Sequence, residues 1–230
     1  IHSRNRITAN WSSLLRIGTT RDDSDSVGAF PGYFRTDQHQ ATWQNDIQLP
    51  VGTLVGGLEY LDQRVASNTL FKQTGRTVAS AFAGYVGSFG DHGLQVNARH
   101  DDNSDFDDAN NYRAAVRIPI APQRTTLFVN AGTGTKNPTF VERYGFTPDT
   151  FIGNPHLRPE ESRSVSVTVE QLLGETARVR VTGFHDRLDD EINGFAFDPV
   201  ASGFTAVNTN GESQRDGMEL SVLASLNAAI

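Results

Sequence analysis

A stretch of the chain between residues 135 and 161, TKNPTFVERYGFTPDTFIGNPHLRPEE, carries side chains that could bind a solute. It combines aromatic rings, a guanidinium group and a carboxamide, which supply flat apolar surface and hydrogen bonds at ligand sites. The candidates for solute contact are Arg143, Tyr144, Phe146, Phe151 and Asn154. A connection of this length between β segments is uncommon unless it has a function. The segment therefore predicts noncovalent binding of a solute.

Turn-forming residues punctuate the same stretch. We expect them to fold the connection back on itself, because proline and glycine favour turns. These residues are Pro138, Gly145, Gly153, Pro155 and Pro159. Glu160 and Glu161 lie next to Arg158 and Arg163, and this spacing predicts ion pairs at the edge of the fold.

Other kinds of chemistry find little support in the sequence. The acidic run 101–108 could attract Ca²⁺, but it lacks the ligand spacing of an EF-hand loop, so a solvated acidic loop is the simpler interpretation. The motif at 132–134 leads to Pro138 instead of a helix, which argues against a dinucleotide fingerprint. The six histidines are scattered, the chain has no cysteine and no nucleophile elbow is present. We expect no metal site, no cofactor and no enzymatic activity.

Composition narrows the possible partners. A net charge of −7 and a pI near 5.3 argue against nucleic-acid binding, since no basic stripe is available for phosphate contacts. Mean hydropathy is −0.41, and no apolar run is long enough for a membrane-spanning helix. A membrane barrel is still allowed, because its strands expose apolar residues to lipid only at every second position.

Segments with period-2 alternation run through the whole chain, and this period is the signature of a strand. Their ranges are 7–17, 38–49, 53–65, 77–86, 94–99, 112–120, 125–134, 164–170, 178–188 and 218–226. In the first of them, Ile7, Trp11 and Ile17 share one face. Trp11, Trp43, Tyr60 and Tyr85 lie where aromatic belts at a membrane interface would need them.

The connections alternate between two lengths. Short Gly- and Pro-containing turns are expected at 49–52, 88–93, 121–124 and 173–176, and long polar loops at 19–37, 66–75, 101–111, 136–162 and 189–214. Short periplasmic turns opposite long extracellular loops are typical of an outer-membrane barrel. The predicted fold is therefore all-β, an antiparallel transmembrane β-barrel without a helix of consequence. Outer-membrane lipid and lipopolysaccharide would surround it.

Four motifs, in order, resemble the TonB-dependent outer-membrane receptor family. They are LVGGLEY at 54–60, LQVNARHDDNSDF at 94–106, NPTFVERYGF with GNPHLRPEES at 137–162, and VNTNGE with GMEL at 207–220. The sequence TKNPTFVERYGF is most similar to the corresponding motif in the vitamin B12 (cobalamin) branch of the family. The resemblance adds Leu157 and Glu160 to the structural motif residues.

The resemblance implies a Gram-negative outer-membrane receptor with a barrel of about 22 strands closed by an N-terminal plug. Residues 1–230 would be part of that barrel domain, about ten strands of it, with the plug and the C-terminal strands outside the sequence. Such a receptor captures a scarce nutrient, cobalamin or a ferric siderophore, and imports it with energy delivered by TonB.

Two alternatives remain at this point. A passive porin or structural barrel would share the strand pattern without energy coupling. A soluble β-sandwich that binds a ligand would share the period but would bury its apolar rows against a second sheet.

Overall fold

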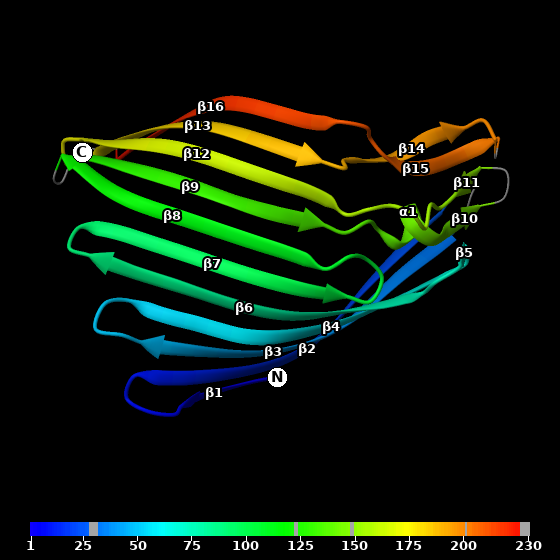
Figure 1. Cartoon of the computed structure of the whole chain (residues 1–230), viewed down its shortest axis with the longest axis horizontal. Helices are drawn as coiled ribbons and strands as arrows, with labels where there is room; N and C mark the ends of the chain where they lie inside the picture. Colours follow the sequence, from blue (N-terminus) through cyan, green and yellow to red (C-terminus); the bar gives the residue numbers. More distant parts are fainter. Residues whose placement is uncertain (28–31, 122–123, 148–149, 201, 226–230) are drawn as a thin grey trace, which may run out of the picture.

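The main body of the protein is one long, curved antiparallel sheet (Figure 1). The computed structural model describes residues 1–27, 32–121, 124–147, 150–200 and 202–225. Eleven strands follow one another in chain order apart from the loop elements, from β1 at one edge to β16 at the other. The strands of this sheet are β1 (His2–Arg6), β2 (Trp11–Ser26), β3 (Gly32–Gln48), β4 (Thr53–Ser67), β6 (Gly75–Phe89), β7 (His92–Asn103), β8 (Ala109–Ala121), β9 (Thr125–Lys136), β12 (Glu160–Leu173), β13 (Ala177–Asp189) and β16 (Glu212–Ala224).

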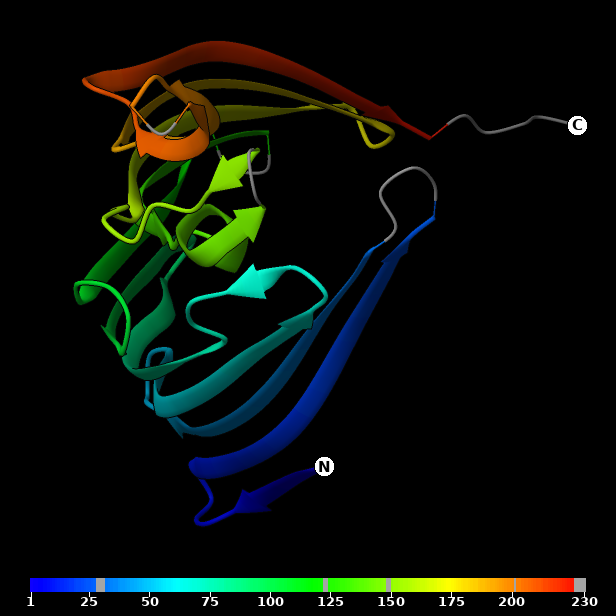
Figure 2. The ribbon, with the colours of Figure 1, turned by 90° about the vertical axis from the view of Figure 1, so that its right-hand side faces the viewer.

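A second, small sheet joins loops that leave the main sheet at different places. Its order is β14-β15-β11-β10-β5. The members are β5 (Leu70–Phe71), β10 (Gly145–Thr147), β11 (Phe151–Ile152), β14 (Ile192–Asp198) and β15 (Gly203–Asn208). β11 pairs with β15 in parallel, and the other pairs are antiparallel. Figure 2 shows these elements and helix α1 (Phe140–Tyr144) inside the concave side of the main sheet.

The predicted alternation of connections is confirmed. The short turns lie at one end of the sheet and the long loops at the other (Figure 1). The strands nevertheless continue far into the segments predicted as loops, and β2 and β3 stay paired up to Ser26 and Gly32. Arg21 and Asp37 face each other there at 2.6 Å. Beyond the membrane both faces of a strand meet water, so the apolar alternation ends before the strand does.

The prediction of a single strand over residues 7–17 is wrong. Residues 7–10 form a tight turn between β1 and β2, in which the amides of Ile7 and Thr8 both donate to the carbonyl of Trp11. The Thr8 hydroxyl donates to Asn10 Oδ1 at 2.8 Å, a local bond of the kind that competes with a strand ladder. Leu226, residues 122–123 of one predicted turn, and residues 28–31, 148–149 and 201 of the predicted loops lie outside the described residues.

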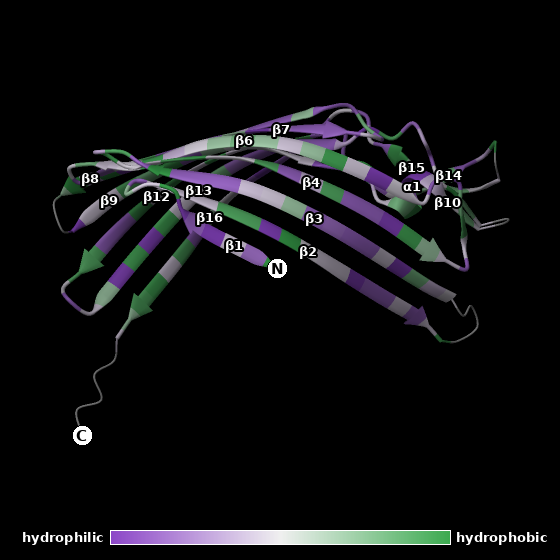
Figure 3. Ribbon diagram, turned by 90° about the horizontal axis from the view of Figure 1, so that it is seen from below, coloured by the Kyte–Doolittle hydropathy of each residue, from purple (hydrophilic) through white to green (hydrophobic). Residues whose placement is uncertain are grey.

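Apolar side chains form continuous rows across the outer, convex face. Leu15, Trp43 and Leu58 are register partners on three successive strands, and Trp43 and Leu58 are about half exposed. Figure 3 shows that hydrophobic and hydrophilic residues alternate along the strands. Both outward indoles are satisfied without water: Trp11 Nε1 donates to Asn45 Oδ1 at 3.0 Å and Trp43 Nε1 to Ser13 Oγ at 2.9 Å.

These exposed rows are incompatible with the soluble β-sandwich alternative. A sandwich would cover them with a second sheet, whereas the small sheet lies on the concave side (Figure 2). A surface of aliphatic and aromatic rows is stable where lipid replaces water. The only helix in the described part of the chain, α1, is too short to cross a membrane.

The concave face is polar and carries ion pairs across strands. Arg99 on β7 reaches Glu59 on β4 at 2.8 Å and Asp101 on its own strand at 2.7 Å. Its guanidinium also donates to Ser80 Oγ on β6 at 2.8 Å. This polarity suits a face that looks into an aqueous interior.

A charge at the middle of the outer face should destabilise the fold. Val167 lies on the convex face of β12, between Val165 and Val169. We expect Val167→Arg to lower the free energy of unfolding by about 2–4 kcal/mol, because the guanidinium would face hydrocarbon. Urea unfolding of the lipid-reconstituted protein measures this loss. Ser166→Arg, the neighbouring position on the concave face, is the matched control, and an equal loss for both variants would contradict the assignment of faces.

Candidate solute site on the loop side

Helix α1 begins with a capping box. The Thr139 hydroxyl accepts from the amide of Glu142 at 3.2 Å, and the Glu142 carboxylate accepts from the amide of Thr139 at 2.7 Å. This reciprocal pair satisfies amides that a helix start otherwise leaves without partners. The Thr-x-x-Glu spacing was the available signal for this helix, which the sequence interpretation missed.

A buried cluster fixes α1 to the loop between β7 and β8. The Tyr144 hydroxyl donates to the Asp105 carboxylate, and the Arg143 guanidinium lies 3.9 Å from the same group. The side chains of Arg143 and Asp105 are 13% and 7% exposed. Arg143 also lies over the ring of Phe106, 4.5 Å from its centroid. Because a buried charge is costly unless it is paired, this cluster holds the helix in one position.

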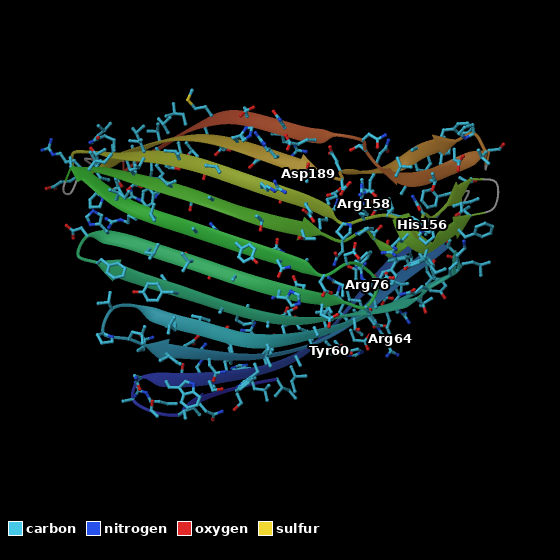
Figure 4. All side chains as sticks on the ribbon, in the orientation of Figure 1. Tyr60, Arg64, Arg76, His156, Arg158 and Asp189 are labelled. Carbon is cyan, nitrogen blue, oxygen red and sulfur yellow. The ribbon has the colours of Figure 1, made fainter. Side chains whose placement is uncertain are left out.

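Arg76 connects the same helix to the wall. Its guanidinium donates to the carbonyl of Pro138 at 2.8 Å and lies 4.6 Å from the ring centroid of Phe140. Pro138 is fully buried. Figure 4 shows Arg76, His156 and Arg158 at the loop end of the sheet.

The Gly153–Asn154 segment closes against the end of α1. The amide of Gly153 donates to the carbonyl of Gly145 at 2.7 Å, and the amide of Asn154 donates to the carbonyl of Glu142 at 2.9 Å. A Cβ on Gly153 would lie 2.7 Å from backbone atoms of Arg143 and Tyr144, so this close approach requires glycine. The Asn154 carboxamide donates to the carbonyl of Ala206 at 3.0 Å.

The end of the connection is tied to neighbouring loops. Leu157 is buried with Phe151 and Ala206 in a small apolar cluster. The Glu160 carboxylate accepts from Lys136 Nζ at 3.0 Å and from the amide of Ile192 at 2.9 Å. Arg158 pairs with Asp190, and Arg163 lies 4.0 Å from Asp189. Pro155 is exposed and Pro159 half-buried. The structural role of the motif residues stays a prediction, which these contacts support.

A cavity of about 830 Å³ opens between four loops at this end of the protein. This volume is in the range of small-molecule sites. Its aromatic lining comes from β3, the β4–β6 loop, β10, β11 and β14. The other lining residues are Val141, glycines and residues with hydroxyl or carboxamide groups. The aromatic residues are Tyr33, Phe34, Phe71, Phe146, Phe151 and Phe195.

Part of this lining is held in place by ring contacts. Phe195 stacks on Phe204 with a centroid distance of 4.2 Å and an interplanar angle of 18°, and Phe151 lies beside it at 6.1 Å. Phe34 and Phe71 meet on another side at 5.8 Å. Rings fixed in this way present flat surface to a ligand without losing much rotamer freedom on binding.

Of the five predicted contact residues, two line the cavity in the structure and three lie elsewhere. Phe146 and Phe151 line the cavity. Arg143 and Tyr144 point into the buried cluster with Asp105, and Asn154 donates to the backbone of strand β15. Solute contact by all five stays a prediction, and the geometry favours Phe146 and Phe151.

Sequence reasoning missed four aromatic residues that complete the cavity, Tyr33, Phe34, Phe71 and Phe195. They come from three other connections. Phe71 and Phe195 are brought near Phe151 by the pairing of the small sheet, whereas Tyr33 and Phe34 lie on β3 of the main sheet. An aromatic residue close to the tip of each long loop was the available signal. The acidic run 101–108 also serves the fold, since Asp101 binds Arg99 and Asp105 accepts from Tyr144.

Comparison with known proteins identifies the class that this architecture defines. The family model of the TonB dependent receptor-like β-barrel matches residues 2–229. The chain therefore belongs to the TonB-dependent receptor β-barrel family and lies in the outer membrane of a Gram-negative bacterium.

Individual relatives agree with this assignment. The chain is 32% identical over 163 residues to the vitamin B12 transporter BtuB of Photobacterium profundum, which covers 69% of the chain and 25% of the relative. It is 26% identical to BtuB of Vibrio vulnificus, covering 93% of the chain and 35% of the relative. The chain thus spans about a quarter to a third of the length of the curated relatives it matches.

Solved structures share the fold at low sequence identity. A ferric enterobactin receptor of Pseudomonas aeruginosa superposes with a TM-score of 0.75 at 14% identity, covering 100% of this chain and 41% of that one. The Serratia marcescens hemophore receptor HasR, solved with its hemophore and heme, superposes with a TM-score of 0.71 at 20% identity, covering 92% and 43%. Expectations of a receptor family and a strand-built outer-membrane protein are confirmed.

The stability that the buried cluster contributes should depend on whether the Tyr144 hydroxyl is protonated. Burial, followed by the bond to Asp105, raises the pKa of Tyr144 to about 12 from an ordinary value of 10.0. A raised pKa stabilises the fold fully below pH 10.0, and this contribution is lost as the pH rises towards 12. A spectrophotometric titration should show one tyrosine that ionises later than the rest, and Tyr144→Phe should remove it.

Tyr144→Phe should also lower the free energy of unfolding by about 1–3 kcal/mol at neutral pH, because the buried Asp105 carboxylate loses its hydroxyl donor. Urea unfolding followed by tryptophan fluorescence measures the loss. Tyr112→Phe, on the exposed outer face, is the control, and an unchanged stability of the Tyr144 variant would show that the cluster does not hold the helix.

Proposed function

We propose that this protein is an active-transport receptor that captures a scarce nutrient on its extracellular loops and imports it with energy delivered by TonB. The observation that carries the proposal is the aromatic cavity between four loops at the long-loop end of the sheet, the end that we place at the cell exterior. A solute that is dilute outside the cell must be bound before it is moved. A preformed concave site with aromatic walls provides that capture.

The ligands named for the relatives indicate which class of solute this protein would bind. Curated relatives are vitamin B12 transporters, and structural neighbours are receptors for ferric enterobactin and for a heme-carrying protein. Cobalamin or a ferric siderophore is therefore the proposed cargo of this chain. A plug in the lumen and the TonB protein would be its partners, and the polar concave face around Arg99 and Glu59 offers hydrogen bonds to such a plug.

Energy-dependent uptake tests the proposal. The test uses cells that express the protein from its own gene and have no other candidate receptor. These cells should accumulate labelled vitamin B12 or ferric enterobactin in a saturable way. Accumulation should stop when the tonB gene is deleted. Non-saturable uptake that continues without TonB would identify a passive pore and reject the proposal.

Phe146 provides a site-specific version of the same test, because it lines the cavity and is only half-buried. Phe146→Ala should raise the substrate concentration for half-maximal uptake about tenfold, since one aromatic contact is lost. The amount of protein in the outer membrane should not change. Phe89→Ala, an exposed aromatic at the opposite end of the sheet, is the control. Equal effects in both variants would contradict a specific role of the cavity.

A further inference from the structure

The described lining of the cavity contains no charged side chain. Beside its aromatic rings it offers hydroxyl groups, from Ser24, Ser26, Ser67, Thr69, Thr147 and Thr150. Hydroxyl groups donate and accept hydrogen bonds but do not neutralise a charge. The surface is therefore suited to a solute that is uncharged where it touches the protein.

Two charged groups close to the cavity, those of Arg35 and Glu142, already have other partners. Arg35 pairs with Asp23 on the neighbouring strand. Glu142, which lies near Gly194, holds the amide of Thr139 in the capping box. Lys72 directly follows Phe71 but is not among the residues that line the cavity. Within the described residues, an anion placed in the cavity would find no lining cation.

Phe195 offers a ring face to the solute. It lines the cavity, is 59% exposed, and is supported from behind by the parallel ring of Phe204. A large apolar side chain exposed in a concave site indicates a binding surface. Phe197 has a similar exposure, 62%, and meets the same Phe204 at 74°, but it does not line the cavity.

From these observations we infer that the cavity binds an uncharged, ring-bearing face of the solute, with Phe195 as a specificity-determining contact, and selects against anionic chelates. This inference rests on the proposed function, because it names the chemistry of the captured nutrient. Transfer of an anion from water into a site without a counter-charge is costly, whereas a neutral ring gains stacking and apolar contacts.

Equilibrium binding to outer-membrane fragments that contain the whole protein tests the inference. The probes are cyano-vitamin B12, a derivative with one side-chain amide hydrolysed to a carboxylate, and ferric enterobactin, which is strongly anionic. We expect the neutral corrinoid to bind most tightly and the carboxylate derivative at least about tenfold more weakly. Preference for ferric enterobactin, or binding of neither corrinoid, would overturn the inference.

Matched variants then identify the contact. Phe195→Ala should weaken binding of the neutral corrinoid about tenfold, while Phe197→Ala and Lys72→Gln should leave it unchanged. A loss for Lys72→Gln with no loss for Phe195→Ala would place the contact at Lys72 instead of the aromatic lining and would also overturn the inference. Circular dichroism and heat-modified gel mobility confirm that each variant retains its strand structure.

These measurements separate the two proposals. Binding of the neutral corrinoid at Phe195 without TonB-dependent uptake would reject the transport function and keep the site assignment. TonB-dependent uptake of an anionic chelate that is insensitive to Phe195→Ala would keep the transport function and reject the site assignment.

Discussion

The structure depends on one constraint, which is that the backbone of the wall must find all its hydrogen bonds between strands. Lipid offers no partner to an unpaired amide or carbonyl. The antiparallel ladders meet this requirement for every strand that lies between the two edge strands, β1 and β16. Because the ladders fix the register, each residue is assigned either to lipid or to the interior, and a shift by one residue would exchange the two faces.

The same register explains why polar groups can occur on the outer face. Asn45 and Ser13 would be costly there alone, but each accepts a hydrogen bond from the indole of a tryptophan on the adjacent strand. The tryptophans thereby satisfy their own N–H groups, as buried indoles generally must. On the inner face, Arg99 connects three strands through Glu59 and Ser80. Side-chain pairs across strands thus reinforce the ladder on both faces.

Much of the wall could be predicted from sequence because its two faces meet different solvents. Ten of the eleven strands and the four short turns follow from period-2 patterning and from Gly and Pro. Strand β1 was missed because its sequence, HSRNR, contains no apolar residue and so shows no alternation. Chance alternation through the turn at residues 7–10 also placed the start of the next strand too early. The loop-side ends of β2 and β3 were also missed. Water lies on both sides of them, so apolar residues no longer alternate with polar ones along the strand.

The site was harder to predict for a different physical reason. Its family motif indicated the connection that contributes Phe146 and Phe151 to the lining of the cavity. Arg143 and Tyr144 have equally suitable side chains for binding, but Asp105, distant in sequence, draws them into a buried cluster. Residues such as Phe71 and Phe195 become neighbours only through long-range pairing of short strands, which carries almost no local signal.

The small loop sheet has a consequence for how new specificities can arise in this protein. Phe151 of β11 is the register partner of Phe204 in β15, and Gly145 of β10 is the partner of Phe71 in β5. Three connections therefore share one hydrogen-bonded unit. Transplanting the connection between β9 and β12 from another receptor would break two pairings at once, β10 with β5 and β11 with β15, and transplanting either of the other two would break one. Productive chimeras would therefore have to exchange the three connections together.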